Sequence, residues 1–256
     1  MRPVNSSWMF GAGSAHMVDT YLTPLEYDGW NMSLVYQRSQ AMKFSPGRWM
    51  QSLTVGLEVD RTENPARNAS MYFAGLRGSW GIMWRHGLPL GLTAAVGPQV
   101  RGDIGVVYSN RNGNNPASVK ADITIGLQGR LSRTFTLGRM PVTLGWQSEL
   151  PVTGAFFSPE YDELYYEIYL GNHTGLAHAA WWGNFFRWDN LVTADFDFSA
   201  TRLRLGFQSG VLSTKVNNIT SRIYNFSFVI GVTTDWFSIR RCREVSPATE
   251  RVIYAF

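Results

Sequence analysis

The strongest hint of enzyme chemistry lies between Tyr161 and Asp195, a stretch that carries acids and histidines. A serine that attacks an ester, a histidine that takes its proton and a polar residue that orients the histidine would together hydrolyse lipids at the outer wall of a membrane protein. The candidates for these roles, in that order, are Ser148 or Ser158, His173 or His178, and Asn184 or Asp189. Their spacing matches no hydrolase signature. The alternative is a hydrogen-bonded extracellular cap, and the sequence favours a protein that is not an enzyme.

The sequence also offers candidate residues for two kinds of cofactor site. His173, His178 and Glu167 could hold a metal ion, but a spacing of five residues outside a helix carries little information, so we expect no metal. Gly11 and Gly13 lack the third glycine and the following helix of a dinucleotide-binding loop. The sequence therefore predicts no cofactor.

The charge and the cysteine content narrow the function further. The net charge of +4 comes from scattered basic residues, apart from Arg240, Arg241 and Arg243, so we expect no nucleic-acid partner. The single cysteine, Cys242, excludes an internal disulfide framework and cysteine-based metal sites. The first ten residues lack an apolar core, which predicts no signal peptide in this sequence.

Alternation of apolar and polar residues is the main structural signal. From Val119 to Leu131 the odd positions are apolar or glycine, whereas the even positions from Lys120 to Ser132 are polar, charged or glycine. Successive side chains of a β-strand point to opposite faces, so this pattern predicts a strand with one apolar face. Similar segments recur with Trp and Tyr near their ends, which is typical of strands that cross a membrane. No run of 18 apolar residues occurs, which excludes a membrane-spanning helix.

The sequence thus predicts an all-β fold, an antiparallel up-and-down barrel in the outer membrane with a lumen largely filled by side chains. Ten strands are expected, at 8–16, 28–44, 49–62, 71–86, 90–108, 117–137, 141–155, 186–198, 201–216 and 221–238. Two more strands within 156–185 would make twelve. Tight connectors alternate with longer ones, as in outer-membrane barrels, and an even number of strands places both termini in the periplasm.

The chain is expected to form a single barrel domain, residues 1–256. Residues 240–256 follow the last strong strand, and they are predicted to be either a periplasmic tail or a closing strand. The segment from Arg251 to Phe256 alternates and ends in Phe, like the C-terminal signal of inserted barrels, but Pro247 and nearby charges separate it from that strand.

If the alternation sets the faces, charged side chains of both signs point into the lumen. They are Glu58, Asp60, Arg77, Arg85, Arg101, Asp103, Lys120, Asp122, Arg130, Glu149, Asp195, Asp197, Arg202, Arg204 and Asp235. The two signs nearly cancel, whereas a selective pore would show an excess of one sign at its constriction. The sequence therefore favours a lumen closed by ion pairs and hydrogen bonds.

An aromatic cluster is the last candidate site, and it consists of Trp181, Trp182, Phe185, Phe186 and Trp188. It is either an interfacial girdle of the membrane or a docking surface for a lipid or a protein partner.

Two segments near the N-terminus, GAGSA at 11–15 and DTYLTPLEYDG at 19–29, carry a resemblance to a known family. They resemble the N-terminal signature of a family of Bacteroidota outer-membrane barrels of unknown function. Stretches within 157–167, 204–207 and 226–231 are similar to that family as well, so the resemblance covers most of the chain. It implies a location and a fold, and it implies no reaction.

Three functions stay open. A structural or accessory subunit of a larger outer-membrane complex is favoured by the balanced lumen, the aromatic cluster and the unusual tail. A narrow diffusion channel and a hydrolase that modifies lipids or lipopolysaccharide are the alternatives. The expected partners are outer-membrane lipids, lipopolysaccharide and other subunits of that complex.

Overall fold

The structure, a computed structural model, describes residues 2–113, 115–161, 163–171, 174–198 and 201–238. Its elements are β1 (Arg2–Asp19), β2 (Thr23–Ala41), β3 (Trp49–Glu63), β4 (Ser70–Gly87), η1 (Pro89–Gly91), β5 (Leu92–Ser109), β6 (Ala117–Leu137), β7 (Met140–Phe157), α1 (Tyr165–Tyr169), β8 (Ala177–Ala180), β9 (Phe185–Asp197), β10 (Arg202–Val216) and β11 (Ile219–Ser238). Among these residues, no helix combines the length and the apolar character needed to cross a membrane.

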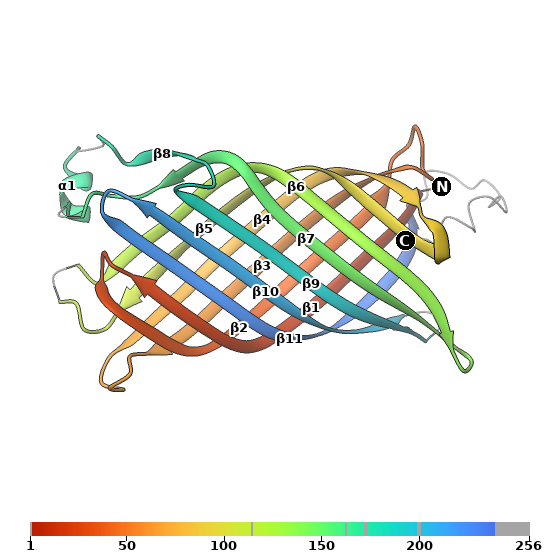
Figure 1. The fold of residues 1–256 in the computed structure, drawn as a ribbon, viewed down its shortest axis with the longest axis horizontal. Coiled ribbons are helices and arrows are strands. Elements are labelled where there is room, and N and C mark those ends of the chain that lie inside the picture. The colour runs from red at the N-terminus through yellow and green to blue at the C-terminus, as the bar shows by residue number, and fades with distance from the viewer. Residues whose placement is uncertain (1, 114, 162, 172–173, 199–200, 239–256) are drawn as a thin grey trace.

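Ten of the strands form a closed ring of long, tilted strands (Figure 1). Each strand pairs antiparallel with its neighbour from β1 to β7, the ring continues through β9, β10 and β11, and β11 pairs with β1 from Arg2↔Ser238 to Asp19↔Ser221. The short strand β8 lies outside this ring and pairs only with the end of β7. The predicted antiparallel barrel of ten strands is therefore confirmed. The segment 156–185, for which two further strands were considered, instead contains α1 and β8.

The two faces of the wall follow the alternation of the sequence. Apolar side chains such as Leu57 (53% exposed) and Ile123 (61% exposed) cover the outer wall, whereas most charged side chains of the strands point inward. Tryptophan and tyrosine gather near both ends of the outer wall, as in the pairs Trp8–Tyr36 and Tyr72–Tyr108. An apolar band between aromatic girdles is what a barrel needs in order to sit in a bilayer.

Each end of the barrel has its own connectors. We call the end that carries Arg2 and Ser238 the terminal end and the opposite end, which carries α1 and β8, the loop end (Figure 1). The expected alternation of tight and long connectors holds only in part, because two very short turns, 20–22 and 217–218, lie at the loop end. Asn217 and Asn218 both adopt positive φ, at 51° and 60°, which is the requirement of a two-residue hairpin turn.

A break in pairing interrupts the wall between β7 and β9, and we call it the seam. β7 pairs with β9 over Val142–Glu149 and with β8 over Gly154–Phe157, so residues 150–153 have neither partner on that side. The indole of Trp182 covers the break by donating a hydrogen bond of 2.7 Å to the carbonyl of Pro151. The residues 240–256, predicted as a tail or a closing strand, lie outside the described part of the chain.

Candidate functional site

The lumen is the candidate site, and Arg101 of β5 is its centre. Its guanidinium donates to both oxygens of Asp103, at 2.6 and 3.0 Å, and lies 3.4 Å from the carboxylate of Glu149 on β7. It also donates to Asp189, which comes from β9, three strands away in the ring. Because Arg101 is only 4% exposed, this cation ties together three strands across the inside of the barrel.

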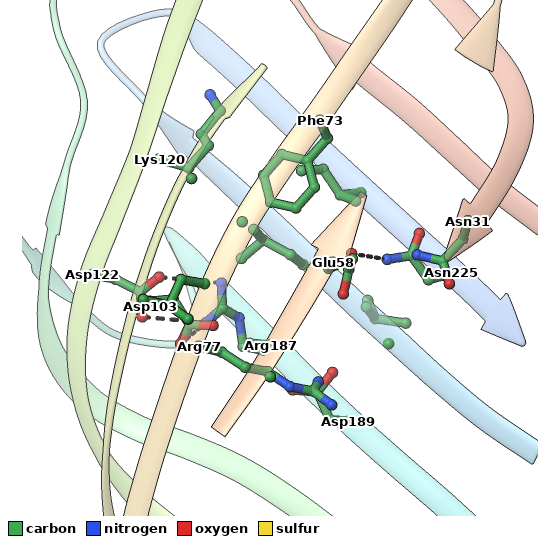
Figure 2. Close-up of a pocket in the computed structure, with 18 of the residues that line it drawn as sticks. Asn31, Glu58, Phe73, Arg77, Asp103, Lys120, Asp122, Arg187, Asp189 and Asn225 are labelled. Carbon is green, nitrogen blue, oxygen red and sulfur yellow. Dashed lines mark hydrogen bonds and ion pairs between the residues drawn. The ribbon is translucent and has the colours of Figure 1, made fainter. Parts of the chain in front are cut away.

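A second arginine, Arg187 of β9, extends the same network. It lies 2.5 Å from Asp103 and 3.1 Å from Asp122 of β6. Figure 2 shows Arg187 and Arg77 reaching into a common cavity with Asp103 and Asp122 around them. Within this network carboxylates and guanidiniums alternate in space, so each of its two arginines lies beside at least two carboxylates, as burial in a low-dielectric interior requires.

Glu58 and Asp60 each accept a hydrogen bond from an amide side chain. The side chain of Asn225 on β11 donates to Glu58 of β3, which again joins strands three apart in the ring (Figure 2). Asn31 donates to Asp60 at 2.6 Å and accepts from the hydroxyl of Ser227 at the same distance. Asp60 is completely buried.

The loop end of the lumen is closed by a contact between opposite walls. Lys120 of β6 and Asp19 of β1 lie five strands apart in the ring of ten, and their side chains meet at 2.7 Å. An apolar cluster surrounds this level and includes Met17, Tyr27 and Met71, all of which are 1% exposed or less. The loop end is therefore filled by side chains.

The segment between β7 and β8 covers this plug. Tyr21 donates from its hydroxyl to the carbonyl of Glu163 at 2.8 Å, and Asn115 donates to the same hydroxyl. Tyr165 of α1 accepts a hydrogen bond of 2.6 Å from the amide of Val119. Burial raises the pKa of Tyr165 to about 12, although the amide of Val119 lowers it, and burial also raises the pKa of Tyr21.

Side chains cross the lumen at the terminal end as well. The hydroxyl of Ser52 on β3 donates to Gln128 on β6 at 2.7 Å, and Arg130 on β6 donates to Ser39 on β2 at 2.5 Å. Arg204 donates two hydrogen bonds of 2.7 Å to the carboxylate of Asp195. Arg202 pairs with Asp235.

The barrel encloses several cavities, among them one at Arg101 and one near the terminal end. The one at Arg101 measures about 70 Å³, which is room for roughly two water molecules. The other, near the terminal end, measures about 230 Å³ and is lined by Arg85, Arg130 and Arg204 among others. No residue lines both of these cavities, but a small third cavity beside Glu149 borders each of them, since it shares Arg77 with the first and Gln147 with the second. Of the charges predicted to point into the lumen, all except Asp60, Asp197 and Asp235 line these two cavities or the small one beside Glu149.

The structure does not bring the hydrolase candidates together. His178 lies on β8, and its Nε2 faces the backbone carbonyl of Ser158 at 3.1 Å, not the serine hydroxyl. Ser148 accepts a hydrogen bond from the indole of Trp188 on the outer wall, whereas Asp189 points into the lumen. Asn184 holds the turn before β9 through the carbonyl of Ala179. His173 lies outside the described residues.

The aromatic cluster is divided between the two faces of the wall. Trp181, Trp182 and Trp188 are exposed, and Phe186 is half-buried on the outer side. Phe185, in contrast, is 3% exposed and packs inside against Phe156, with ring centroids 5.3 Å apart. Its assignment to the surface is wrong, because β9 starts at Phe185 and its odd residues face the lumen.

Sequence reasoning left Arg187, Asp189 and Asp19 out of the lumen network. The missing signal was parity, since 187 and 189 share the odd numbers of Asp195 and Asp197 on the same strand. Extending that alternation to the start of β9 would have placed both side chains inside. Asp19 shares the odd parity of the buried Met9 and Met17, but it lies at the very end of β1, beyond the strand predicted at 8–16.

Comparison with known proteins gives a family and a fold. The model of one family, described as "Protein of unknown function (DUF3316)", matches residues 1–243. No curated protein matches the chain. The outer membrane protease OmpT from Escherichia coli is 8% identical and covers 91% of this chain and 97% of its own, with a TM-score of 0.54. The β domain of the Bordetella autotransporter BrkA is 12% identical and covers 90% of this chain and 98% of its own, with a TM-score of 0.42. Neisserial surface protein A is 10% identical and covers 91% of this chain and 96% of its own, with a TM-score of 0.34. The likeness to OmpT shows an outer-membrane β-barrel fold.

Proposed function

Since the chain belongs to the DUF3316 family, for which no function is known, we propose from its geometry that it is a structural or accessory subunit of a larger outer-membrane complex. The whole chain would form one barrel domain in the outer membrane of a Gram-negative bacterium. Both termini would face the periplasm, and the loop end would face outward. Its membrane surroundings would be lipids and lipopolysaccharide.

The closed lumen carries this proposal. Side chains from non-adjacent strands cross it at the level of Lys120 and Asp19, again at Arg101, and again at Ser52 and Gln128. A channel needs a continuous water path, and ion pairs that span the ring occupy that path. An enzyme of the lipid-hydrolase type needs a nucleophile beside its base, which the positions of Ser148 and His178 do not provide. A rigid, plugged barrel with an apolar wall supports a scaffolding role.

Exposed aromatic side chains at the loop end support the presence of a partner. Tyr166, Tyr169 and Leu170 on and beside α1 are at least 65% exposed, and Trp181 is 62% exposed nearby along the chain. Aromatic residues are enriched at the centres of protein interfaces, where they bury a large area at low entropic cost. These side chains are candidate contacts for another subunit.

A purification from native membranes in mild detergent, followed by mass spectrometry, tests the proposal. We expect other outer-membrane proteins at stoichiometric amounts, and we expect their recovery to fall when Tyr169 and Leu170 are both replaced by serine. Recovery of the chain without any other protein would contradict the proposal. Channel currents from the native protein in a planar bilayer would support the channel instead.

A further inference from the structure

Three polar side chains interrupt the apolar outer wall side by side. Asn190 of β9 pairs in register with Ser148 of β7 on one side and with Ser209 of β10 on the other. Asn190 projects outward, because its neighbours of the same parity, Trp188 and Val192, are 44% and 52% exposed. The wall at this place therefore offers amide and hydroxyl groups to the membrane.

The register places Asn190 at mid-depth of the apolar band. Residues directly opposite one another form a row across the sheet, and this row runs from Trp84 on β4 to Trp30 on β2, with Asn190 four strands from each. Trp84 belongs to the girdle near the terminal end and Trp30 to the girdle near the loop end. With strands ~4.8 Å apart and tilted by about 40°, the row climbs roughly 3 Å per strand, or about 12 Å over four strands. That is half of a ~25 Å apolar band.

Polar groups at this depth need partners that lipid chains cannot supply. The Oδ1 atom of Asn190 accepts from the indole of Trp146 at 3.3 Å, and Ser148 accepts from Trp188 at 2.9 Å. Within the described part of the chain, the Nδ2 of Asn190 and the hydroxyl of Ser209 make no hydrogen bond. An unpaired donor in hydrocarbon is unfavourable, because no water is present to accept its hydrogen bond.

We propose that the outer face formed by β7, β9 and β10 binds a second copy of this chain, with Asn190 at the two-fold axis. Two copies in one membrane are related by an axis along the membrane normal, which keeps every residue at its own depth. A residue on that axis meets itself, and a carboxamide is suited to this because it both donates and accepts. Nδ2 of each Asn190 then finds the free lone pair of the other Oδ1.

The polar groups of this outer face are suited to bind a second copy of the same face. Asn190 and its two serine neighbours carry no charge and are all both donor and acceptor, so the face complements itself. The residues flanking Asn190 in the row are small, Ser148 and Ser209, with Gly129 next to Ser148. Small residues let membrane-embedded backbones approach closely. This inference stands apart from the proposed function, since a pair of copies can form with or without further subunits.

Disulfide trapping in native outer membranes tests the face. In a Cys242→Ser background, Asn190→Cys is expected to give a disulfide-linked dimer on mild oxidation. The matched control is Val55→Cys, since Val55 is also lipid-facing, lies midway between Trp49 and Arg61 on β3, and sits five strands away on the opposite wall. Its expected yield of dimer is at background level. Equal yields from the two variants, or none from Asn190→Cys, would overturn the inference.

A second measurement does not depend on cysteine chemistry. When two differently tagged copies are co-expressed, the native sequence should recover both tags, and Asn190→Leu should weaken the association about tenfold. Val55→Leu should leave it unchanged. Recovery of other stoichiometric proteins without a second copy would overturn this inference and leave the proposed function standing. A second copy without other proteins would do the reverse, and a lone single copy would overturn both.

Discussion

Removing Arg101 tests whether the lumen network holds the barrel together. Arg101→Met keeps much of the side-chain length but deletes the charge. Asp189 and Glu149 then lose the one cation that lies within ion-pair distance of them among the described residues, whereas Asp103 keeps Arg187 at 2.5 Å. Two carboxylates are left inside the barrel without compensation.

The size of the effect follows from this loss. Breaking a buried ion pair by deleting one partner costs about 3–5 kcal/mol, because the remaining charge stays desolvated. We expect Arg101→Met to lower the free energy of unfolding by about that amount. Adding Glu149→Gln and Asp189→Asn removes the orphaned charges, and the triple variant should recover most of the loss.

Urea unfolding in lipid vesicles, followed by tryptophan fluorescence, measures these differences, and the chain carries 10 Trp as reporters. Planar-bilayer recordings serve as a control, since the single variant should stay closed while Lys120–Asp19 and Ser52–Gln128 still cross the lumen. A loss below about 1 kcal/mol would refute the reasoning, because a pair of that strength behaves as if it were exposed to solvent. Failure of the triple variant to recover stability would refute it as well.

Three further perturbations act away from Arg101. Asp19→Asn leaves Lys120 facing a neutral amide across the lumen, so unfolding should become easier by about 2–4 kcal/mol, measured by the same urea titration. Burial raises the pKa of Tyr165 to about 12, above the unfolded value near 10.0, so an unfolded chain releases this proton first and stability should fall as the pH rises from about 10 to 12. Absorbance titration of the native protein and of Tyr165→Phe isolates this group, and a difference between the two that appears already at pH 10 would contradict the assignment. Trp182→Phe removes the hydrogen bond that covers the seam, which is worth about 1 kcal/mol. Proteolysis within 158–184 should become faster, while the ten strands of the ring stay resistant. An unchanged cleavage rate would show that other contacts hold the segment.

Prediction from sequence succeeded where local geometry decides the outcome. The period of two belongs to the extended backbone itself, so the alternation from Val119 to Leu131 was enough to assign the outer and inner faces of β6. Ten strands and a closed ring followed from repeating that pattern. The one surface assignment that failed, Phe185, lies at the start of β9, and the odd parity of Asp195 and Asp197 on the same strand would have placed it inside.

The sequence by itself therefore determined the wall of the barrel. It shows which residues form strands and which side of each strand is apolar, and it shows that charges of both signs are available inside. Only the tertiary structure decided which of those charges meet, because Lys120 and Asp19, or Arg101 and Asp189, become neighbours only after the ring has closed in one register. The depth of Asn190 likewise depends on eight successive strand pairings. Register and closure are properties of the whole ring, and no local pattern contains them.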